Sequence, residues 1–207
     1  HNVIAFDNFF NSKENVVEHI KELSGKDFIF YNADMTNQDD LEKIFSENQI
    51  DCVIQFAGYK AVGESVQFPL SYYHNNIYGT LCLLNAMKAH NVKKIIFSSS
   101  ATVYGNPDSL PIKEDFPLSA TNPYGRTKLM IEEILRDLWK SDPDWSIILL
   151  RYFNPVGAHK SGVLCEDPKG IPNNLMPRLL DVAFGKTPYI TVFGDDYNTK
   201  DGTGVRD

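Results

Sequence analysis

Residues 94–153 contain two apolar runs, KIIF at 94–97 and SIILLRYF at 146–153, with a long amphipathic stretch at 124–140 between them. Short apolar runs bounded by polar residues predict buried strands, and apolar positions repeating with the helical period predict a helix. A strand, a helix and a second strand joined in this way form a βαβ unit with parallel strands. This segment therefore indicates an α/β fold.

The same alternation continues upstream. Thr36 and Asp39 have the spacing of an acidic capping box and predict the start of a helix. Strands that are apolar along their length need helices on both faces, so we expect an α/β protein with a doubly wound parallel sheet of the Rossmann type. The upstream strands are expected at 2–6, 27–32 and 51–56, and the helices at 16–23, 38–47 and 72–90.

The pattern weakens after Asn154, where Gly, Pro and polar residues become frequent. One helix is expected at 175–184 and one short strand at 189–193. We therefore expect two regions, residues 1–154 and residues 155–207, of which the second is the start of a smaller domain.

The composition argues against several classes of protein. The net charge is −7, with scattered Lys and Arg, which disfavours binding to nucleic acid. No apolar run approaches the ~20 residues that span a bilayer, so no membrane insertion is expected. The three cysteines are odd in number and far apart, and two fall in segments that read as core, which suggests reduced packing residues in a cytoplasmic protein. No His, Cys and carboxylate set has the spacing of metal ligands, so no metal is expected.

Asp7 ends the first expected strand. In a dinucleotide-binding fold, an acidic residue at such a place hydrogen-bonds the adenine ribose and favours NAD over NADP. Alone, Asp7 is equally well explained as the start of a turn. The glycine-rich turn that should precede it by ~20 residues is absent. Because the chain begins at His1 and opens directly on an apolar run, we expect a fragment without its natural start.

Phe56, Ala57 and Gly58 end another expected strand. Small residues there let the backbone approach a cofactor at the carboxyl edge of the sheet, where such folds bind ligands. A glycine needed for a tight turn is the alternative explanation, and it is the better one if these residues are taken alone.

Tyr124 and Lys128 stand four residues apart at the start of a helix, and so on one face of it. A phenol is a poor base at neutral pH, but a nearby ammonium favours its ionised form and lowers its pKa. Ser98, Ser99 and Ser100 would place hydroxyls at the same edge of the sheet. A Tyr–Lys pair at this spacing is a weak signal alone, because many such pairs are solvated surface residues.

Longer motifs carry a more specific signal. In order along the whole chain they are FAGYKAVGESV (56–66), SSSATVYG (98–105), PYGRTK (123–128), RYFNPVGAH (151–159), GIPNNLMP (170–177) and DGTGVRD (201–207). Through them the chain resembles the UDP-galactose (UDP-glucose) 4-epimerases of the extended short-chain dehydrogenase/reductase family. The resemblance implies an NAD-dependent isomerase that interconverts UDP-galactose and UDP-glucose by reversible oxidation at C4 of the sugar. It also implies that both ends are missing and that the fragment itself is inactive.

The resemblance implies roles for residues at matching positions. The catalytic group would be Ser100, Tyr124 and Lys128. NAD would be held by Asp7, Asn8, Asn11, Ser12, Asp34, Met35, Phe56, Ala57, Gly58, Lys60, Asn75, Ser98, Tyr124, Lys128 and Tyr152. The UDP-hexose would meet Ser100, Tyr124, Phe153, Asn154, Asn174, Leu175, Phe193 and Arg206. Residues 1–154 would then be a partial NAD-binding domain and residues 155–207 a partial nucleotide-sugar-binding region.

Two other functions are weighed against this one. The first is a nucleotide-sugar 4,6-dehydratase or decarboxylase, whose fold resembles the one expected here. However, Ala101 and Thr102 stand where dehydratases carry acidic residues. A non-catalytic module that binds NAD or nucleotide-sugar would be expected to have lost the Ser–Tyr–Lys set, which is intact. The resemblance also implies a homodimer, through helices at 72–90 and 124–140. Whether N-acetylated UDP-hexoses are substrates is not decided by these residues.

Overall fold

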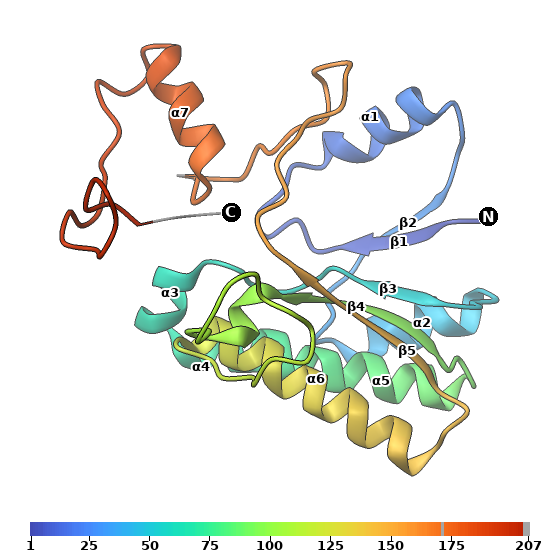
Figure 1. Cartoon of the computed structure of the whole chain (residues 1–207). Helices are drawn as coiled ribbons and strands as arrows, with labels where there is room; N and C mark the ends of the chain where they lie inside the picture. The colour runs from blue at the N-terminus through green and yellow to red at the C-terminus, as the bar shows by residue number, and fades with distance from the viewer. Residues whose placement is uncertain (171, 205–207) are drawn as a thin grey trace. The chain divides into compact units, whose positions relative to one another are not determined.

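The computed structural model describes residues 1–170 and 172–204 and divides the chain into two compact units. The first unit contains residues 1–8 and 29–153, and the second contains residues 9–28 and 154–207. Alternating strands and helices build the first unit, which confirms the α/β prediction (Figure 1).

All strands of the first unit pair in parallel. β1 (Ile4–Asp7) pairs with β2 (Ile29–Asn32) in one sheet. β3 (Val53–Gln55), β4 (Lys94–Ser100) and β5 (Ser146–Tyr152) form a second sheet in the order β3-β4-β5. In its last register pair, Ser100 lies opposite Tyr152, so both residues reach the same carboxyl edge.

Within the described residues, β1 and β3 are not hydrogen-bonded to each other. In the doubly wound order 3-2-1-4-5-6, the first strand lies between the strands that correspond here to β1 and β3. The break between the two sheets therefore falls at the position that the first strand has in this order.

The helices of the first unit begin and end close to the predicted positions. They are α2 (Gln38–Glu47), α3 (Val62–Gln67), α4 (Pro69–Tyr72), α5 (Gly79–Ala89) and α6 (Pro123–Ser141), with a π-helical turn at Tyr73–Tyr78 and a 3₁₀ turn at Ala101–Tyr104. The single helix predicted at 72–90 is thus a π-helical turn followed by α5, and α3 and α4 were not predicted.

The sequence predicted Thr36 as the N-terminal cap of α2, and this prediction is wrong. Asn37 is the cap, and its side-chain oxygen accepts hydrogen bonds from the backbone N–H groups of Asp39 and Asp40. An Asn side chain in this position satisfies donors that the first helical turn leaves unpaired. Thr36 instead donates its hydroxyl to Asp34.

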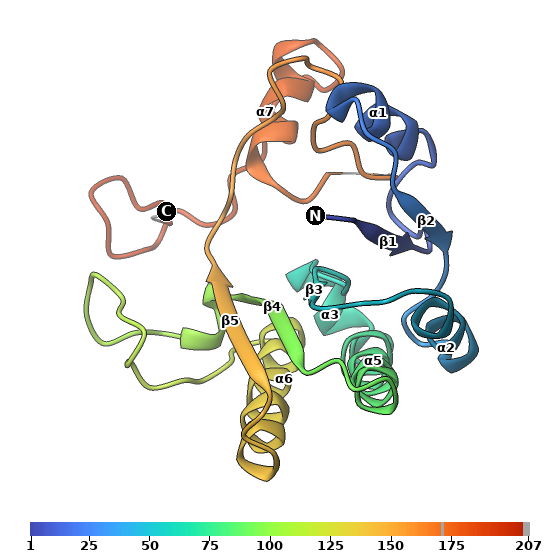
Figure 2. The same ribbon diagram turned by 90° about the vertical axis from the view of Figure 1, so that its right-hand side faces the viewer.

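The core of the first unit lies between the sheet and one layer of helices. Figure 2 shows α5 and α6 side by side beneath β3, β4 and β5. Ile95 and Phe97 of β4 pack there against Leu83 and Met87 of α5 and Ile131 of α6, all of them nearly inaccessible to solvent. Burying this much apolar surface at about 25 cal/mol per Å² is the main force that holds α6 against β4.

The second unit contains α1 (Asn15–Ser24) and α7 (Leu175–Ala183). Gly25 ends α1 in the left-handed conformation, and its N–H donates to the carbonyl of Lys21. The strand predicted at 189–193 is wrong, because these residues have no strand conformation. Strand propensity depends on a neighbouring strand and a buried face, and Phe193 is 85% exposed.

The cysteines are all free, but only Cys82 is buried, so the expectation that two of them lie in the core is wrong. Cys52 is exposed because it precedes β3 and lies outside the packed part of the strand. None of the helices in the part of the chain that the structure describes is long and apolar enough to cross a bilayer. Across residues 1–170 and 172–204, no group of three or more His, Cys, Asp or Glu side chains could hold a metal ion.

Candidate active site

The predicted Ser–Tyr–Lys group forms where β4 ends and α6 begins. Ser100 is the last residue of β4, and it caps the 3₁₀ turn because its hydroxyl oxygen accepts a hydrogen bond of 3.2 Å from the N–H of Thr102. Asn122 caps α6 by accepting 2.8 Å from the N–H of Gly125, and Pro123 occupies the first helical position. Tyr124 and Lys128 therefore lie on the first two turns of a well-capped helix.

Lys128 is a buried lysine held by a backbone oxygen. Its Nζ donates a 2.7 Å hydrogen bond to the carbonyl of Ser98 and lies 4.9 Å from the centroid of the Phe97 ring. Burial disfavours the ammonium form and lowers the pKa of Lys128 to about 8. Lys128 can therefore lose or regain a proton close to neutral pH.

Tyr124 lies against both partners that the sequence predicts for it. Its side chain lies beside that of Ser100, and the Nζ of Lys128 lies 5.9 Å from the centroid of its ring. Burial raises the pKa of Tyr124, and the nearby Ser100 hydroxyl opposes this rise only in part. The expected lowering of this pKa by Lys128 is thus not found, because the same burial that raises the pKa of Tyr124 lowers that of Lys128.

The backbone after β3 passes close to Lys128 at Gly58. Gly58 has a φ of +151°, and a Cβ there would lie 3.3 Å from Asn76 Oδ1 and 3.7 Å from Lys128 Nζ. The backbone conformation favours glycine, and the space beside Asn76 is tight for a Cβ. The small residue predicted for close backbone approach therefore lies beside Lys128.

Asn76 fixes this segment, and the sequence analysis missed it. Its Oδ1 accepts from the N–H of Tyr59 at 2.8 Å, and its Nδ2 donates to the Tyr59 carbonyl at 3.0 Å and to Thr127 Oγ1 at 3.0 Å. The neighbouring Asn75, which was predicted, donates to Asn76 Oδ1 at 3.0 Å. An Asn-Asn pair inside a long apolar pattern was the available signal, but only the π-helical turn shows which Asn points inward.

Asn8 and Asp34 meet at the carboxyl ends of β1 and β2, where the resemblance places them. Asn8 Nδ2 donates 2.8 Å to Asp34 Oδ2, and Thr36 donates to Asp34 Oδ1 through both its N–H and its hydroxyl. Burial acts to raise the pKa of Asp34, but the hydrogen bonds from Thr36 and Asn8 outweigh it and lower the pKa. Asp34 is therefore an ionised acceptor at neutral pH.

The other predicted residues of the first unit lie along the same edge, with one exception. Asp7 ends β1, Phe56, Ala57 and Lys60 follow β3, Ser98 lies on β4, and Tyr152 and Phe153 end β5. The side chain of Met35 is instead packed in the core against the position of Gly79.

The remaining predicted residues belong to the second unit. They are Asn11, Ser12, Asn154, Asn174, Leu175 and Phe193. Asn174 precedes α7 and donates its Nδ2 to Glu166, and Leu175 begins α7. Arg206 lies outside the described residues.

The sequence of residues 1–207 matches the profile of the NAD dependent epimerase/dehydratase family over its full length. The chain belongs to this family. The Ser–Tyr–Lys group and the parallel sheet described above are thus found in a member of the NAD dependent epimerase/dehydratase family.

Individual relatives in the family are similar to most or all of the chain. It is 60% identical to UDP-glucose 4-epimerase of Bacillus subtilis over 205 residues, and 59% identical to that of Dictyostelium discoideum over 204 residues, each match covering 99% of the chain. The crystal structure of UDP-glucose 4-epimerase from Bifidobacterium longum in complex with NAD+ and UDP superposes with a TM-score of 0.97 at 57% identity, covering 100% of the chain and 62% of that structure. The chain spans 60% and 59% of the length of the first two relatives.

Proposed function

We propose that the complete protein containing this chain is a UDP-glucose 4-epimerase that interconverts UDP-galactose and UDP-glucose with NAD as cofactor. The arrangement of Ser100, Tyr124 and Lys128 at one edge of the sheet carries this proposal. The identities of 57–60% to UDP-glucose 4-epimerases support it. Residues 1–154 would supply part of the NAD-binding domain, and residues 155–207 part of the nucleotide-sugar-binding region.

The residues at this edge suit a dinucleotide. Asn8 and ionised Asp34 offer acceptors for ribose or adenine donors. Gly58 presents bare backbone beside Lys128, whose Nζ can donate to a ribose hydroxyl. We propose that Asp7, Asn8, Asp34, the Met35 backbone, Phe56, Ala57, Gly58, Lys60, Asn75, Ser98, Tyr152 and, from the second unit, Asn11 and Ser12 hold NAD.

In the proposed chemistry, Tyr124 is the acid–base group that exchanges a proton with the 4-hydroxyl of the sugar. NAD, when bound, supplies an acceptor and later a donor of hydride at the sugar C4. In its phenolate form the Tyr124 oxygen would take the proton of the 4-hydroxyl, and the phenol so formed would return it, a positioned acid–base step worth ~10²–10⁴ in rate. Ser100 lies beside Tyr124 and would orient it, and Lys128 ties α6 to β4 through the carbonyl of Ser98. Phe153, Asn154, Asn174, Leu175, Phe193 and Arg206 are proposed to bind the UDP-hexose.

Epimerisation is favoured over elimination by the residues after Ser100. Elimination requires an acid and a base beyond the Tyr–Lys pair. Ala101 has no ionisable group, and the Thr102 hydroxyl donates to Ser100 Oγ at 3.0 Å. Neither side chain can supply that acid or base, so a 4,6-dehydratase or decarboxylase is disfavoured.

We further propose a cytoplasmic homodimer. Tyr78, Leu81 and Trp139 expose apolar surface on the helical layer that contains α5 and α6, which supports an interface there. The absence of a disulfide among the three cysteines is in keeping with a reducing compartment.

The test is to express the complete coding sequence and incubate the protein with UDP-galactose. We expect an equilibrium mixture with UDP-glucose and no accumulation of free NADH, because the cofactor is regenerated in each cycle. Stoichiometric release of NADH, or a 4-keto-6-deoxy product, would contradict the proposal.

A further inference from the structure

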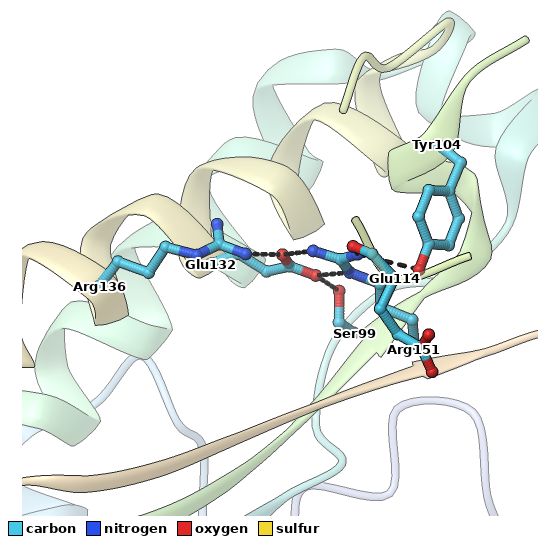
Figure 3. Close-up of polar contacts among 6 residues, drawn as sticks. All are labelled: Ser99, Tyr104, Glu114, Glu132, Arg136 and Arg151. Carbon is cyan, nitrogen blue, oxygen red and sulfur yellow. Dashed lines mark hydrogen bonds and ion pairs between the residues drawn. The ribbon is translucent and has the colours of Figure 1, made fainter. Parts of the chain in front are cut away.

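Glu132 is a fully buried carboxylate on the same stripe of α6 as the proposed catalytic residues. Tyr124, Lys128, Glu132 and Arg136 follow one another at four-residue intervals, so they lie along one face of the helix. The Glu132 side chain is 0% exposed. A buried charge needs close partners, and Figure 3 shows how they converge on this carboxylate.

Three side chains donate to the carboxylate of Glu132. Ser99 Oγ donates to Oε1 at 2.6 Å, and Arg151 donates to both oxygens, from Nε at 3.0 Å and from Nη2 at 2.8 Å. Arg136 adds a bond of 2.7 Å to Oε2. Burial alone would raise the pKa of Glu132, but the hydrogen bonds from Arg151, Ser99 and Arg136 lower it, so the carboxylate is ionised.

Arg151 extends the cluster to the turn that follows Ser100. Its Nη1 donates to the hydroxyl of Tyr104 at 2.9 Å and to the backbone carbonyl of Glu114 at 3.0 Å. The guanidinium carbon also lies 4.8 Å from the centroid of the Tyr104 ring. A guanidinium group is planar and rigid, so one of its edges can donate to a carboxylate while another edge donates to other acceptors. The ammonium group of a lysine cannot do this with fixed geometry.

The cluster and the proposed catalytic group are joined through consecutive residues of β4. Lys128 donates to the carbonyl of Ser98, and one helical turn later Glu132 accepts from the hydroxyl of Ser99. Ser100, which lies beside Tyr124, is the next residue of the strand. The 3₁₀ turn that Ser100 begins ends at Tyr104, which Arg151 holds.

We propose that Glu132 and Arg151 act as a positioning pair that fixes the distance between Ser100 on β4 and Tyr124 on α6. This inference rests on the proposed epimerase function. A buried ion pair adds little net stability compared with apolar residues of similar volume. Its directional bonds instead fix α6, β4, β5 and the 3₁₀ turn relative to one another. A misplacement of about 1 Å can cost ~10²-fold in rate.

The test compares three variants of the complete, NAD-loaded protein. Glu132→Gln keeps the shape of the side chain but replaces one carboxylate oxygen with an amide N–H group, which cannot accept hydrogen bonds from the arginines. The double variant Glu132→Leu/Arg151→Met removes both charges and leaves no buried charge unpaired. Arg136→Ala is the matched control, because Arg136 is 40% exposed and Arg151 still holds the same carboxylate oxygen without it.

We expect kcat to fall ~10- to 100-fold in both Glu132 variants, following the cost of misplaced catalytic groups. The KM for UDP-galactose and the NAD content should change less than about twofold, since a positioning role affects the reacting geometry rather than binding. Arg136→Ala should keep the wild-type kcat. A merely structural role would lower the melting temperature and leave kcat per folded molecule unchanged.

Amide hydrogen exchange of residues 98–104 gives a readout that does not depend on turnover. Faster exchange there in the Glu132 variants, with unchanged exchange in α2, supports the positioning role even if the wild-type protein fails to epimerise and the proposed function falls. Unchanged exchange together with wild-type kcat would overturn the positioning role. Failure of both Glu132 variants to fold would also overturn it, because the pair would then be structural.

Discussion

Lys128 Nζ donates a 2.7 Å hydrogen bond to the backbone carbonyl of Ser98, which joins the second turn of α6 to the end of β4. The two residues are 30 positions apart in the sequence. The bond places Lys128 beside the last three residues of β4, which are Ser98, Ser99 and Ser100. Tyr124, one turn earlier, is thereby placed against Ser100. The predictions below test what each part of this arrangement does.

Tyr124→Phe should lower kcat by ~10²–10⁴ in the complete protein and leave bound NAD nearly unchanged, because only the acid–base hydroxyl is removed. Tyr31→Phe is the matched control. The Tyr31 hydroxyl donates to Glu47 at 2.9 Å and takes no part in the Ser–Tyr–Lys group. Turnover and cofactor content of both variants are measured at equal protein concentration. Wild-type turnover in Tyr124→Phe would reduce Tyr124 to a residue of the helix.

Burial of Lys128 should make stability depend on pH. Its pKa is lowered to about 8 in the folded chain from the ordinary 10.5, so between these values the unfolded chain binds more protons at this site. The free energy of unfolding therefore rises with pH across that window, by at most about 1.4 kcal/mol per pH unit from this group.

Denaturant unfolding of the cofactor-free complete protein from pH 7 to 11 measures this slope. Lys128→Met should lose the rise between pH 8 and 10.5, while Lys140→Met, at a lysine with a 67% exposed side chain, should keep it. Parallel pH profiles for the wild type and Lys128→Met would show that Lys128 has an ordinary pKa.

Gly58→Ala should weaken NAD binding and destabilise the fold by ~1–3 kcal/mol, the cost of a strained backbone conformation. The added methyl would meet Asn76 Oδ1 at 3.3 Å in a conformation that L-residues avoid. Gly63→Ala is the control, since that glycine lies within α3 with open space around its Cα. There the substitution should be neutral or stabilising by up to ~1 kcal/mol. Melting temperature and NAD titration distinguish the two variants, and equal behaviour would count against a close approach at Gly58.

The sequence predicts best what depends on local periodicity. The boundaries of α2 were predicted to the residue, because its apolar positions and its polar flanks agree. The π-helical turn at 73–78 could not be predicted, since it accommodates Asn76, whose partners Tyr59 and Thr127 are distant in sequence. The strand expected at 189–193 had the right residues but has no partner among the described residues of its unit.

The candidate site divides in the same way. Tyr124, Lys128 and Ser100 were predicted through the resemblance that the longer motifs carry, because a four-residue spacing on one helix is a weak signal alone. The pair of Glu132 and Arg151 could not be predicted, because it depends on the register that sets Arg151 opposite Ser99. Pairing across strands is a tertiary property that no local pattern contains.

The 207-residue chain alone should be aggregation-prone and should not retain NAD. Within the described residues, β1 and β3 each leave one edge without a neighbouring strand, and unpaired edges recruit other chains. Ile54 and Ile148 are exposed on strands of the three-stranded sheet, which adds apolar surface. The chain and the complete protein are to be expressed side by side, with light scattering, thermal unfolding and bound NAD measured for each.

The variant Ile148→Lys tests whether the face of the sheet that carries Ile148 is exposed in the 207-residue chain and buried in the complete protein. In the 207-residue chain the added charge should reduce scattering, because Ile148 is 48% exposed and a charge on a β-face opposes association. In the complete protein the same change should destabilise the fold if further helices cover both faces of the sheet, as in doubly wound proteins, since an unpaired charge would then be buried. A cooperative melt with stoichiometric NAD in the unmodified short chain would contradict the prediction, because the chain would then form its cofactor site without a strand between β1 and β3.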